Sequence, residues 1–179
     1  MKDDVVTGHQ RAELPGLVGV WRLAWEDEGL VELAPLSHGK LIPSGEAVLA
    51  EGQGVLPSWL WDGWIRFWRG EDPAVPLVGR VPPFFGRVYA VVRRIPVGGA
   101  RTYRQVAEEV GVPEGARAVG QAMRKNPWAL FVPCHRVVRT DGGLAGYGGP
   151  TGTPLKRALL LMEGVTALPG GVSLKGGRP

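Results

Sequence analysis

Residues 102–125 carry the local signals of two short helices joined by a tight turn. Thr102-Tyr103-Arg104-Gln105 has the form of a capping box, in which the Thr and Gln side chains satisfy the first free amides of a helix. That helix should run over about 103–110, and a second one, rich in small residues, over about 116–125. This is the layout of a helix-turn-helix and favours nucleic-acid binding, although many helical hairpins share it.

An apolar helix and a proline-rich stretch precede this pair. Residues 84–95 place apolar side chains three and four residues apart, which is the period of an amphipathic helix. Pro96 and Gly98-Gly99 should end it. Val75–Pro83 is rich in proline and predicts a linker between two units of the chain. A last helix is expected over about 155–163.

The residues before the linker predict a small sheet and one helix. Residues 17–25 mix β-branched, aromatic and aliphatic side chains, and residues 30–36 alternate apolar and polar ones, so both are predicted strands with Gly29 in the turn. Residues 59–68 are dense in aromatic side chains, which favours a helix that packs into the core.

The predicted fold class is α+β, with a change of character near residue 77. An N-terminal α/β domain, a small antiparallel sheet plus a helix, should be followed by a mainly helical domain that holds the helix-turn-helix and the cysteine. The expected boundaries are 1–77 for the structural domain, 78–165 for the DNA-binding domain and 166–179 for a flexible tail.

The net charge differs in sign between the two halves. Residues 1–79 hold 6 Lys and Arg against 12 Asp and Glu, whereas residues 80–160 hold 13 against 4. A basic surface that neutralises phosphates releases counterions, so this contrast favours a polyanionic partner. From charge alone, a solvated basic face is an equally good interpretation.

Composition limits the compartment and the cofactors that we expect. No run of about 18 apolar residues is present, and the N-terminus lacks the basic-then-apolar pattern of a secretory signal. The single cysteine excludes an internal disulfide and a zinc site of clustered thiolates. We therefore expect a cytoplasmic monomer with no membrane contact, no metal and no cofactor.

That cysteine is Cys134, in the sequence Pro-Cys-His-Arg at 133–136. A free thiol is mostly protonated at neutral pH, so a nucleophilic role needs a nearby base or positive charge, which His135 or Arg136 could supply. Neighbours on an extended strand face opposite sides, however, and an inert buried cysteine is the more common case. Glu163 could orient His135 in a Cys–His–carboxylate set, or could be an exposed acid at a helix end.

Residues 93–164 resemble the C-terminal domain of the O6-alkylguanine-DNA alkyltransferases. The pattern RAVG…AM…NP…PCHRV…G…YGG…K…LL…EG carries the resemblance, whereas the first half resembles the family only in size and texture. The resemblance implies DNA repair on double-stranded DNA, approached from the minor groove. O6-alkylguanine would be flipped out of the duplex, and its alkyl group would move once and irreversibly to Cys134.

The resemblance also implies roles for individual residues. Cys134 would be the nucleophile, His135 its base through a bridging water, and Glu163 the group that orients His135. Asn126 would brace the active-site turn, and Tyr103 would help to extrude the nucleotide. The expected DNA-binding residues are Tyr103, Arg117 (which fills the vacated space), Ala116, Ala118, Gly120, Arg124 and Arg136. The expected pocket residues are Val137, Tyr147, Gly148, Trp128 and Lys156.

Two departures from the family pattern affect the expected pocket. Trp128 stands where the family often has a small residue, which predicts a narrower or reshaped alkyl pocket, and residues 150–153 lengthen the following loop. Three other functions compete with alkyl transfer. An alkyltransferase-like damage-binding protein would lack the cysteine, a cysteine hydrolase would not need Arg117, and a sequence-specific regulator would leave Cys134 unexplained.

Overall fold

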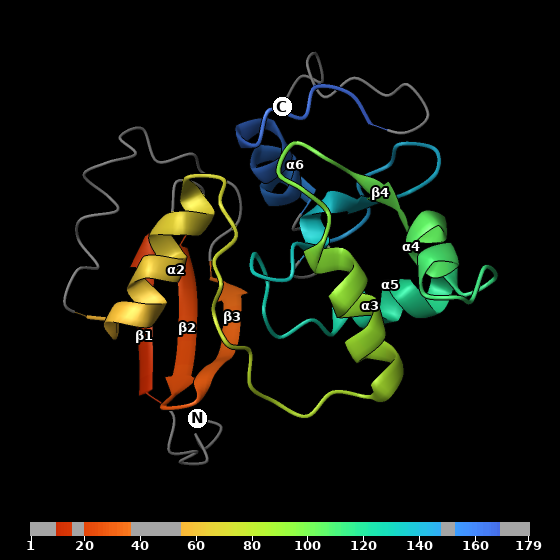
Figure 1. The fold of residues 1–179 in the computed structure, drawn as a ribbon. Helices are drawn as coiled ribbons and strands as arrows, with labels where there is room; N and C mark the ends of the chain where they lie inside the picture. Colours follow the sequence, from red (N-terminus) through yellow and green to blue (C-terminus); the bar gives the residue numbers. More distant parts are fainter. Residues whose placement is uncertain (1–9, 16–19, 37–54, 148–152, 169–179) are drawn as a thin grey trace, which may run out of the picture.

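The computed structural model describes residues 10–15, 20–36, 55–147 and 153–168. In these residues the first half forms a three-stranded antiparallel sheet with one helix, and the second half forms four α-helices and a two-stranded parallel sheet (Figure 1). The predicted α+β class is confirmed. No helix among the described residues combines the length and the apolar character needed to cross a membrane.

The sheet of the first half lies under a helix rich in aromatic residues. Its strands are, in spatial order, β1 (Gln10–Pro15), β2 (Val20–Glu26) and β3 (Gly29–Pro35). Helix α2 (Ser58–Trp68) covers one face of the sheet (Figure 1), and its Trp68 meets Trp21 of β2 edge to face, with ring centroids 6.4 Å apart. Strand β1 was not predicted, because its sequence QRAELP places only two apolar side chains, Ala12 and Leu14, before a proline, which is too short a pattern to signal a strand.

Gly29 marks a close crossing of the chain and is not in the turn where it was expected. The turn is Asp27-Glu28, and Gly29 opens β3 with a φ of +153°. A Cβ atom there would lie 2.6 Å from the carbonyl oxygen of Pro76. The next residue, Leu30, donates its amide to that oxygen at 2.9 Å and accepts from the Val78 amide at 2.9 Å. The predicted linker is therefore hydrogen-bonded along the start of β3.

The helices of the second half follow the sequence signals closely. They are α3 (Pro83–Arg93), α4 (Tyr103–Glu109), α5 (Ala116–Arg124) and α6 (Thr153–Met162). The capping box is present: the Gln105 amide donates to the Thr102 hydroxyl at 3.1 Å, and the Thr102 amide donates to the Gln105 side chain at 2.8 Å. Strand β4 (Arg101–Thr102) pairs in parallel with β5 (Val137–Val138), which fixes the start of α4 beside the segment that follows Cys134.

The two halves share one hydrophobic core. Backbone hydrogen bonds join them, since the Leu33 amide of β3 donates to Pro127 at 2.7 Å and the Ala129 amide donates to Leu33 at 2.9 Å. The indole of Trp128 lies in this junction, which we call the seam, and donates to the Leu30 carbonyl oxygen at 2.9 Å. One cluster of buried side chains runs from the sheet through the seam to Cys134 and α6. The predicted division near residue 77 thus separates regions that pack as one body.

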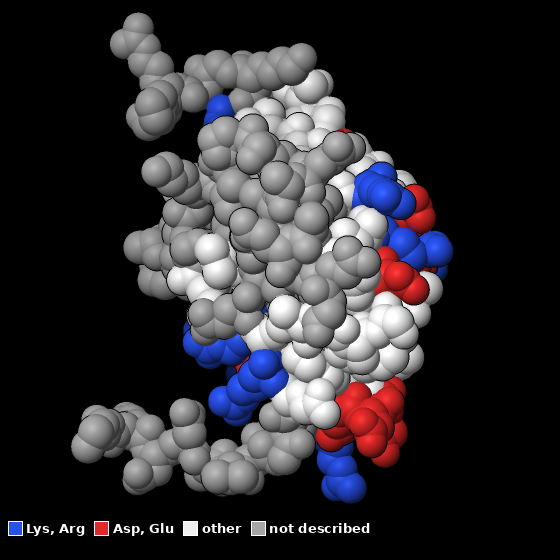
Figure 2. All heavy atoms as spheres, turned by 90° about the vertical axis from the view of Figure 1, so that its left-hand side faces the viewer, with Lys and Arg blue, Asp and Glu red and all other residues white. Residues whose placement is uncertain are grey.

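The acidic character of the first half is not gathered into one patch on the face seen in Figure 2. Among the described residues visible there, acidic and basic side chains lie close together between uncharged areas. In the first half, Arg66 and Glu71 form one exposed pair of opposite charge, 3.8 Å apart. Among the described residues on this side, the charge contrast in the sequence is therefore not seen as a surface of one sign.

Candidate active site

Cys134 lies on a short 3-10 helix, η1 (Cys134–Arg136), and not on an extended strand. The Cys134 amide donates to Val132 at 2.7 Å and the Arg136 amide donates to Pro133 at 2.9 Å. Because the three residues follow a tight helical turn, their side chains leave the backbone in three directions. Cys134 contributes to the wall of a pocket, while His135 and Arg136 are buried.

Asn126 is hydrogen-bonded to both ends of the segment that leads into this turn. Its amide nitrogen donates to the carbonyl oxygen of Val132 at 2.9 Å, and its amide oxygen accepts from the Trp128 amide at 3.0 Å. A carboxylate could not make both bonds, because an ionised carboxylate only accepts. Asn126 also stabilises the thiolate form of Cys134, since its side chain lowers the pKa of that thiol against the larger opposing effect of burial.

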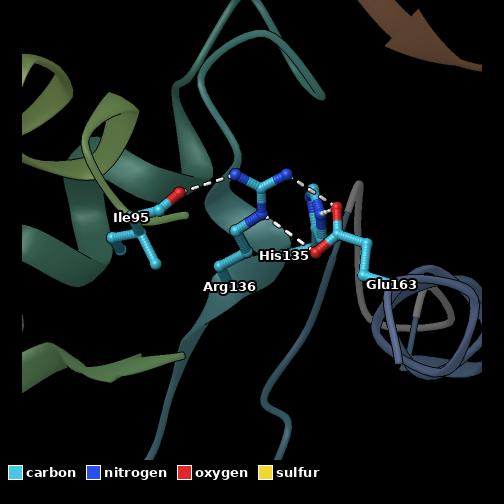
Figure 3. A network of polar contacts seen from close by, with 4 residues as sticks. All are labelled: Ile95, His135, Arg136 and Glu163. Carbon is cyan, nitrogen blue, oxygen red and sulfur yellow. Dashed lines mark hydrogen bonds and ion pairs between the residues drawn. The ribbon is translucent and has the colours of Figure 1, made fainter. Parts of the chain in front are cut away.

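His135 and Arg136, the two residues after Cys134, form a polar network with Glu163 (Figure 3). The imidazole Nε2 of His135 lies 2.8 Å from Oε1 of Glu163, the residue directly after α6. Arg136 donates from Nη2 to the same oxygen at 2.8 Å and from Nε to Oε2 at 2.9 Å. Its Nη1 reaches the Ile95 carbonyl oxygen at 2.6 Å, just beyond α3. All three side chains are at least nine-tenths buried.

The charge state of Glu163 determines which nitrogen of His135 carries the proton. Burial raises the pKa of the Glu163 carboxyl, but His135 and Arg136 outweigh it and lower the value to about 2. Glu163 is then a carboxylate, which can only accept, so Nε2 of His135 is the protonated nitrogen. Burial also lowers the pKa of His135 itself, and Glu163 opposes that effect. The imidazole is therefore neutral, and its buried Nδ1 has no hydrogen-bond partner among the described residues.

The thiol of Cys134 is not activated by its surroundings alone. Burial raises the pKa of Cys134 above its ordinary value, and Asn126 and then Lys156 oppose this. Lys156 is itself 1% exposed, and burial lowers its pKa to about 8. A buried thiol with a raised pKa needs a base at the moment of reaction. The neutral His135, which follows Cys134 directly in the sequence, is the candidate for that base.

A pocket of about 820 Å³ opens in front of Cys134. Helices α4 and α5 form one side of it, and residues 139–147 form the other. Burial raises the pKa of Tyr103, which lines the pocket, to about 12, so its phenol remains a proton donor at neutral pH. The pocket is lined by Tyr103, Arg104, Ala116, Arg117, Gly120, Met123, Arg124, Cys134, Arg139, Thr140, Asp141, Ala145, Gly146 and Tyr147. Its volume is in the usual range for sites that enclose a small molecule or a nucleoside.

The pocket brings together many of the residues expected from the sequence. Tyr103, Ala116, Arg117, Gly120, Arg124 and Tyr147 all line it with Cys134, and Arg117 and Arg124 are exposed. Ala118 is half-buried on α5 and is not among the lining residues. Val137 and Lys156 lie behind the wall, where the Lys156 ammonium donates to the Val137 carbonyl oxygen. Gly148 and residues 150–152 lie outside the described residues.

Two expected roles do not agree with the structure. Arg136 was expected to bind DNA, but its guanidinium is 7% exposed and donates to Glu163 and Ile95. Trp128 was expected to shape the alkyl pocket, but it is 5% exposed in the seam and is not among the pocket-lining residues. Both corrections have the same cause, which is a buried partner far away in the sequence.

Sequence reasoning missed the far rim of the pocket. Arg139 makes two hydrogen bonds to the Asp141 carboxylate, at 3.1 and 2.7 Å, and the Gly143 amide donates to the same carboxylate at 2.9 Å. These bonds close a small exposed loop beside Thr140. The Asp-Gly pair at 141–142 signals a turn, but nothing in its spacing from Cys134 indicates that the turn lies at the pocket. Among the described residues, no three His, Cys, Asp or Glu side chains form a group that could hold a metal ion.

Comparison with known proteins agrees with this geometry. Residues 83–165 match the DNA-binding domain of the 6-O-methylguanine DNA methyltransferase family. A constitutive methylated-DNA–protein-cysteine methyltransferase of Bacillus subtilis is 41% identical over 93 residues, which are 52% of this chain and 56% of that protein. A methylated-DNA–protein-cysteine methyltransferase of Mycobacterium tuberculosis is 49% identical over 80 residues, 45% of this chain and 47% of that protein. The matched region thus spans about half the length of these curated relatives.

Similarity to a solved structure extends much further along the chain. The crystal structure of Mycobacterium tuberculosis OGT in complex with DNA superposes with a TM-score of 0.67 and 33% sequence identity. The superposition covers 84% of this chain and 90% of that one. The family match is limited to residues 83–165, whereas the superposition covers 84% of the chain. The superposed region must therefore include much of the first half as well.

Proposed function

We infer that this chain, which belongs to the methylated-DNA–protein-cysteine methyltransferase family, repairs DNA by moving the alkyl group of an O6-alkylguanine onto Cys134. The observation that carries the proposal is the position of that thiol. Cys134 lies in the wall of a pocket whose other side is the helical pair α4 and α5, and a buried His135–Glu163 pair lies behind it. The helical pair would bind double-stranded DNA, and the pocket would receive the flipped nucleotide.

In the proposed reaction, one sulfur–carbon bond forms and one oxygen–carbon bond breaks. His135 Nδ1 takes the thiol proton through a bridging water, and the sulfur lone pair attacks the alkyl carbon. The electrons of the O6–carbon bond leave with the guanine oxygen. The Tyr103 phenol and the water path from His135 are the proton donors available to the departing base. The products are guanine in DNA and a thioether on Cys134.

The same geometry supports single use of the protein. A thioether has no good leaving group. Cys134 is the single cysteine of the sequence, so the pocket has no second thiol to accept the alkyl group. Once alkylated, Cys134 cannot regain its proton, so one chain accepts one alkyl group. We propose that it does so as a cytoplasmic monomer, without a cofactor or metal.

A stoichiometric transfer assay tests the proposal. The full chain is mixed with a duplex oligonucleotide that contains one O6-[methyl-³H]guanine, and label on the protein is followed with time. We expect one methyl group per chain, recovered in tryptic peptide 126–136, and then no further transfer. A Cys134→Ala variant should bind the same duplex and accept no label. Continued turnover would indicate a hydrolase, and tight binding without transfer would indicate a damage-recognition protein.

A further inference from the structure

We propose that Arg136 is a positioning residue for the reaction, holding Glu163 against His135 so that the imidazole stays a neutral base. This inference rests on the proposed alkyl transfer. It replaces the DNA-binding role expected for Arg136, whose guanidinium is buried and does not line the pocket.

Arg136 holds the Glu163 carboxylate in a defined position (Figure 3). Glu163 follows the last turn of α6, and its side chain would be free to rotate if only one bond held it. Arg136 binds both carboxylate oxygens, from Nε to Oε2 at 2.9 Å and from Nη2 to Oε1 at 2.8 Å. A planar guanidinium that meets a carboxylate in this paired way fixes both its position and its plane. Oε1 is thereby held 2.8 Å from Nε2 of His135.

Arg136 is itself anchored to another segment of the chain. Its Nη1 donates to the Ile95 carbonyl oxygen at 2.6 Å, and this residue is the second beyond α3. The guanidinium therefore links three separate parts of the chain: the end of α3, the 3-10 helix of Cys134 and the end of α6. Glu163 also lies at a helix C-terminus, where the helix dipole disfavours a negative charge. A buried cation at this point offsets that disfavoured charge.

Charges of both signs surround His135 and act on its protonation in opposite directions. Glu163 at the end of α6 favours imidazole protonation, while Arg136 on η1 and Lys156 on α6 oppose it. The other titratable neighbours are Cys134, adjacent on η1, and Tyr147, whose ring lies edge-on at 6.2 Å between centroids. Without Arg136, a full carboxylate charge would act on His135 with less opposition. The imidazole would then take up a proton more readily and would lose the Nδ1 lone pair that accepts the thiol proton.

The test compares Arg136→Gln with Arg136→Lys. We expect Arg136→Gln to slow methyl transfer at pH 7 by about tenfold to a hundredfold, which is less than the roughly 10²- to 10⁴-fold contribution of a general base, because His135 is weakened and not removed. Its rate should also begin to fall at a higher pH than in the wild type when the solution is acidified. Arg136→Lys keeps the charge but loses the paired geometry. Its rate at pH 7 should therefore drop, while its acidic limb stays near that of the wild type.

Direct titration separates this role from a merely structural one. The His135 imidazole is followed by NMR in DNA-free protein, and its titration should move to higher pH in Arg136→Gln but not in Arg136→Lys. If Arg136→Gln does not fold, the double variant Arg136→Gln with Glu163→Gln removes both buried charges. This double variant should fold and transfer the methyl group slowly. The pH at which its His135 titrates should no longer be raised by the charge of Glu163. Arg66→Gln removes an exposed arginine of α2 and should leave the rate and the acidic limb unchanged.

The outcomes distinguish the two proposals. If the wild type transfers no methyl group, the proposed function is wrong, whatever Arg136 does. If the wild type transfers but Arg136→Gln keeps the wild-type pH profile and His135 titration, the positioning role is wrong. A rate loss in Arg136→Gln that matches its loss of folded protein, with no shift of the acidic limb, would likewise overturn it.

Discussion

The two halves of this chain place different demands on their residues. The second half matches its family along residues 83–165, and its turns, caps and charged side chains have specific partners at the site. The first half is held by a sheet under a helix whose aromatic side chains pack edge to face. A core of this kind is satisfied by shape and apolar character. Chemistry restricts the sequence of one half, and packing restricts the other more loosely.

The halves nevertheless meet behind the reacting groups. Phe67 of α2 lies edge-on to the His135 ring at 6.3 Å between centroids and contacts Phe131 at 6.1 Å. The first half therefore supplies an apolar contact to His135, the proposed general base in the second half. This contact is where the contrast between a chemical half and a packing half can be tested.

Removal of that contact should have the largest effect on stability. Phe67 is 4% exposed, so Phe67→Ala leaves a cavity and should lower the free energy of unfolding by about 3–5 kcal/mol. Urea unfolding followed by circular dichroism measures this. We also expect a single transition, because the core is continuous. Two separate transitions would show that the halves unfold independently and would contradict the shared core.

Arg117→Ala should affect function with little effect on stability. Arg117 is exposed at the first turn of α5 and lines the pocket. If it fills the space of the flipped nucleotide, its loss removes a contact that offsets unstacking. Transfer from duplex DNA should then slow by about a hundredfold, since unstacking a base costs a few kcal/mol. Transfer from a single-stranded oligonucleotide should change far less. Equal losses on both substrates would contradict the role.

Acid should destabilise the protein through the buried network of the second half. The pKa of Glu163 is lowered to about 2 in the folded state, so its contribution to stability is present above the ordinary value near 4.5. That contribution should be lost as the pH falls from about 4.5 toward 2. Unfolding free energies of the wild type and Glu163→Gln, measured across this window, should therefore converge on acidification. A constant difference between them would show that Glu163 has an ordinary pKa in the folded protein.

Trp128→Phe should have the smallest effect. The change keeps an aromatic ring in the seam but removes the hydrogen bond from the indole to the Leu30 carbonyl oxygen. The loss in unfolding free energy should be about 1–2 kcal/mol, because one buried acceptor loses a partner. Relative rates on O6-methylguanine and on a bulkier O6-benzylguanine should remain as in the wild type. A changed ratio of these two rates would show that Trp128 does shape the alkyl pocket.

The sequence predicted local features better than distant ones. The capping box at Thr102 and Gln105 and the helical period of 84–95 both act within a few residues, and each appears in the structure. Cys134 and Asn126 could be assigned because a family pattern fixes their spacing. Arg136 and Trp128 were misplaced because their partners, Glu163 and Leu30, are 27 and 98 residues away. Charge and size gave no indication of either pairing.

At the pocket rim, too, the local contact could be predicted from the sequence, but its position in the fold could not. Arg139 and Asp141 pair within three residues, which a turn signal can predict. Their position opposite α4 and α5 depends on the parallel pairing of β4 with β5, and each of those strands has only two residues. A pairing so short leaves no periodic pattern in the sequence. The structure was needed to place this loop at the pocket.

The position of Trp128 also gives the protein an optical probe of its own. Six of the seven tryptophans lie before residue 70, and Trp128 is the only indole of the second half. Indole emission depends on the polarity around the ring, and the Trp128 ring is buried between β3 and Tyr89, whose ring centroid is 5.9 Å away. The difference in fluorescence between the wild type and Trp128→Phe therefore isolates the seam. Any event that parts the two halves should be visible in that difference spectrum without an added label.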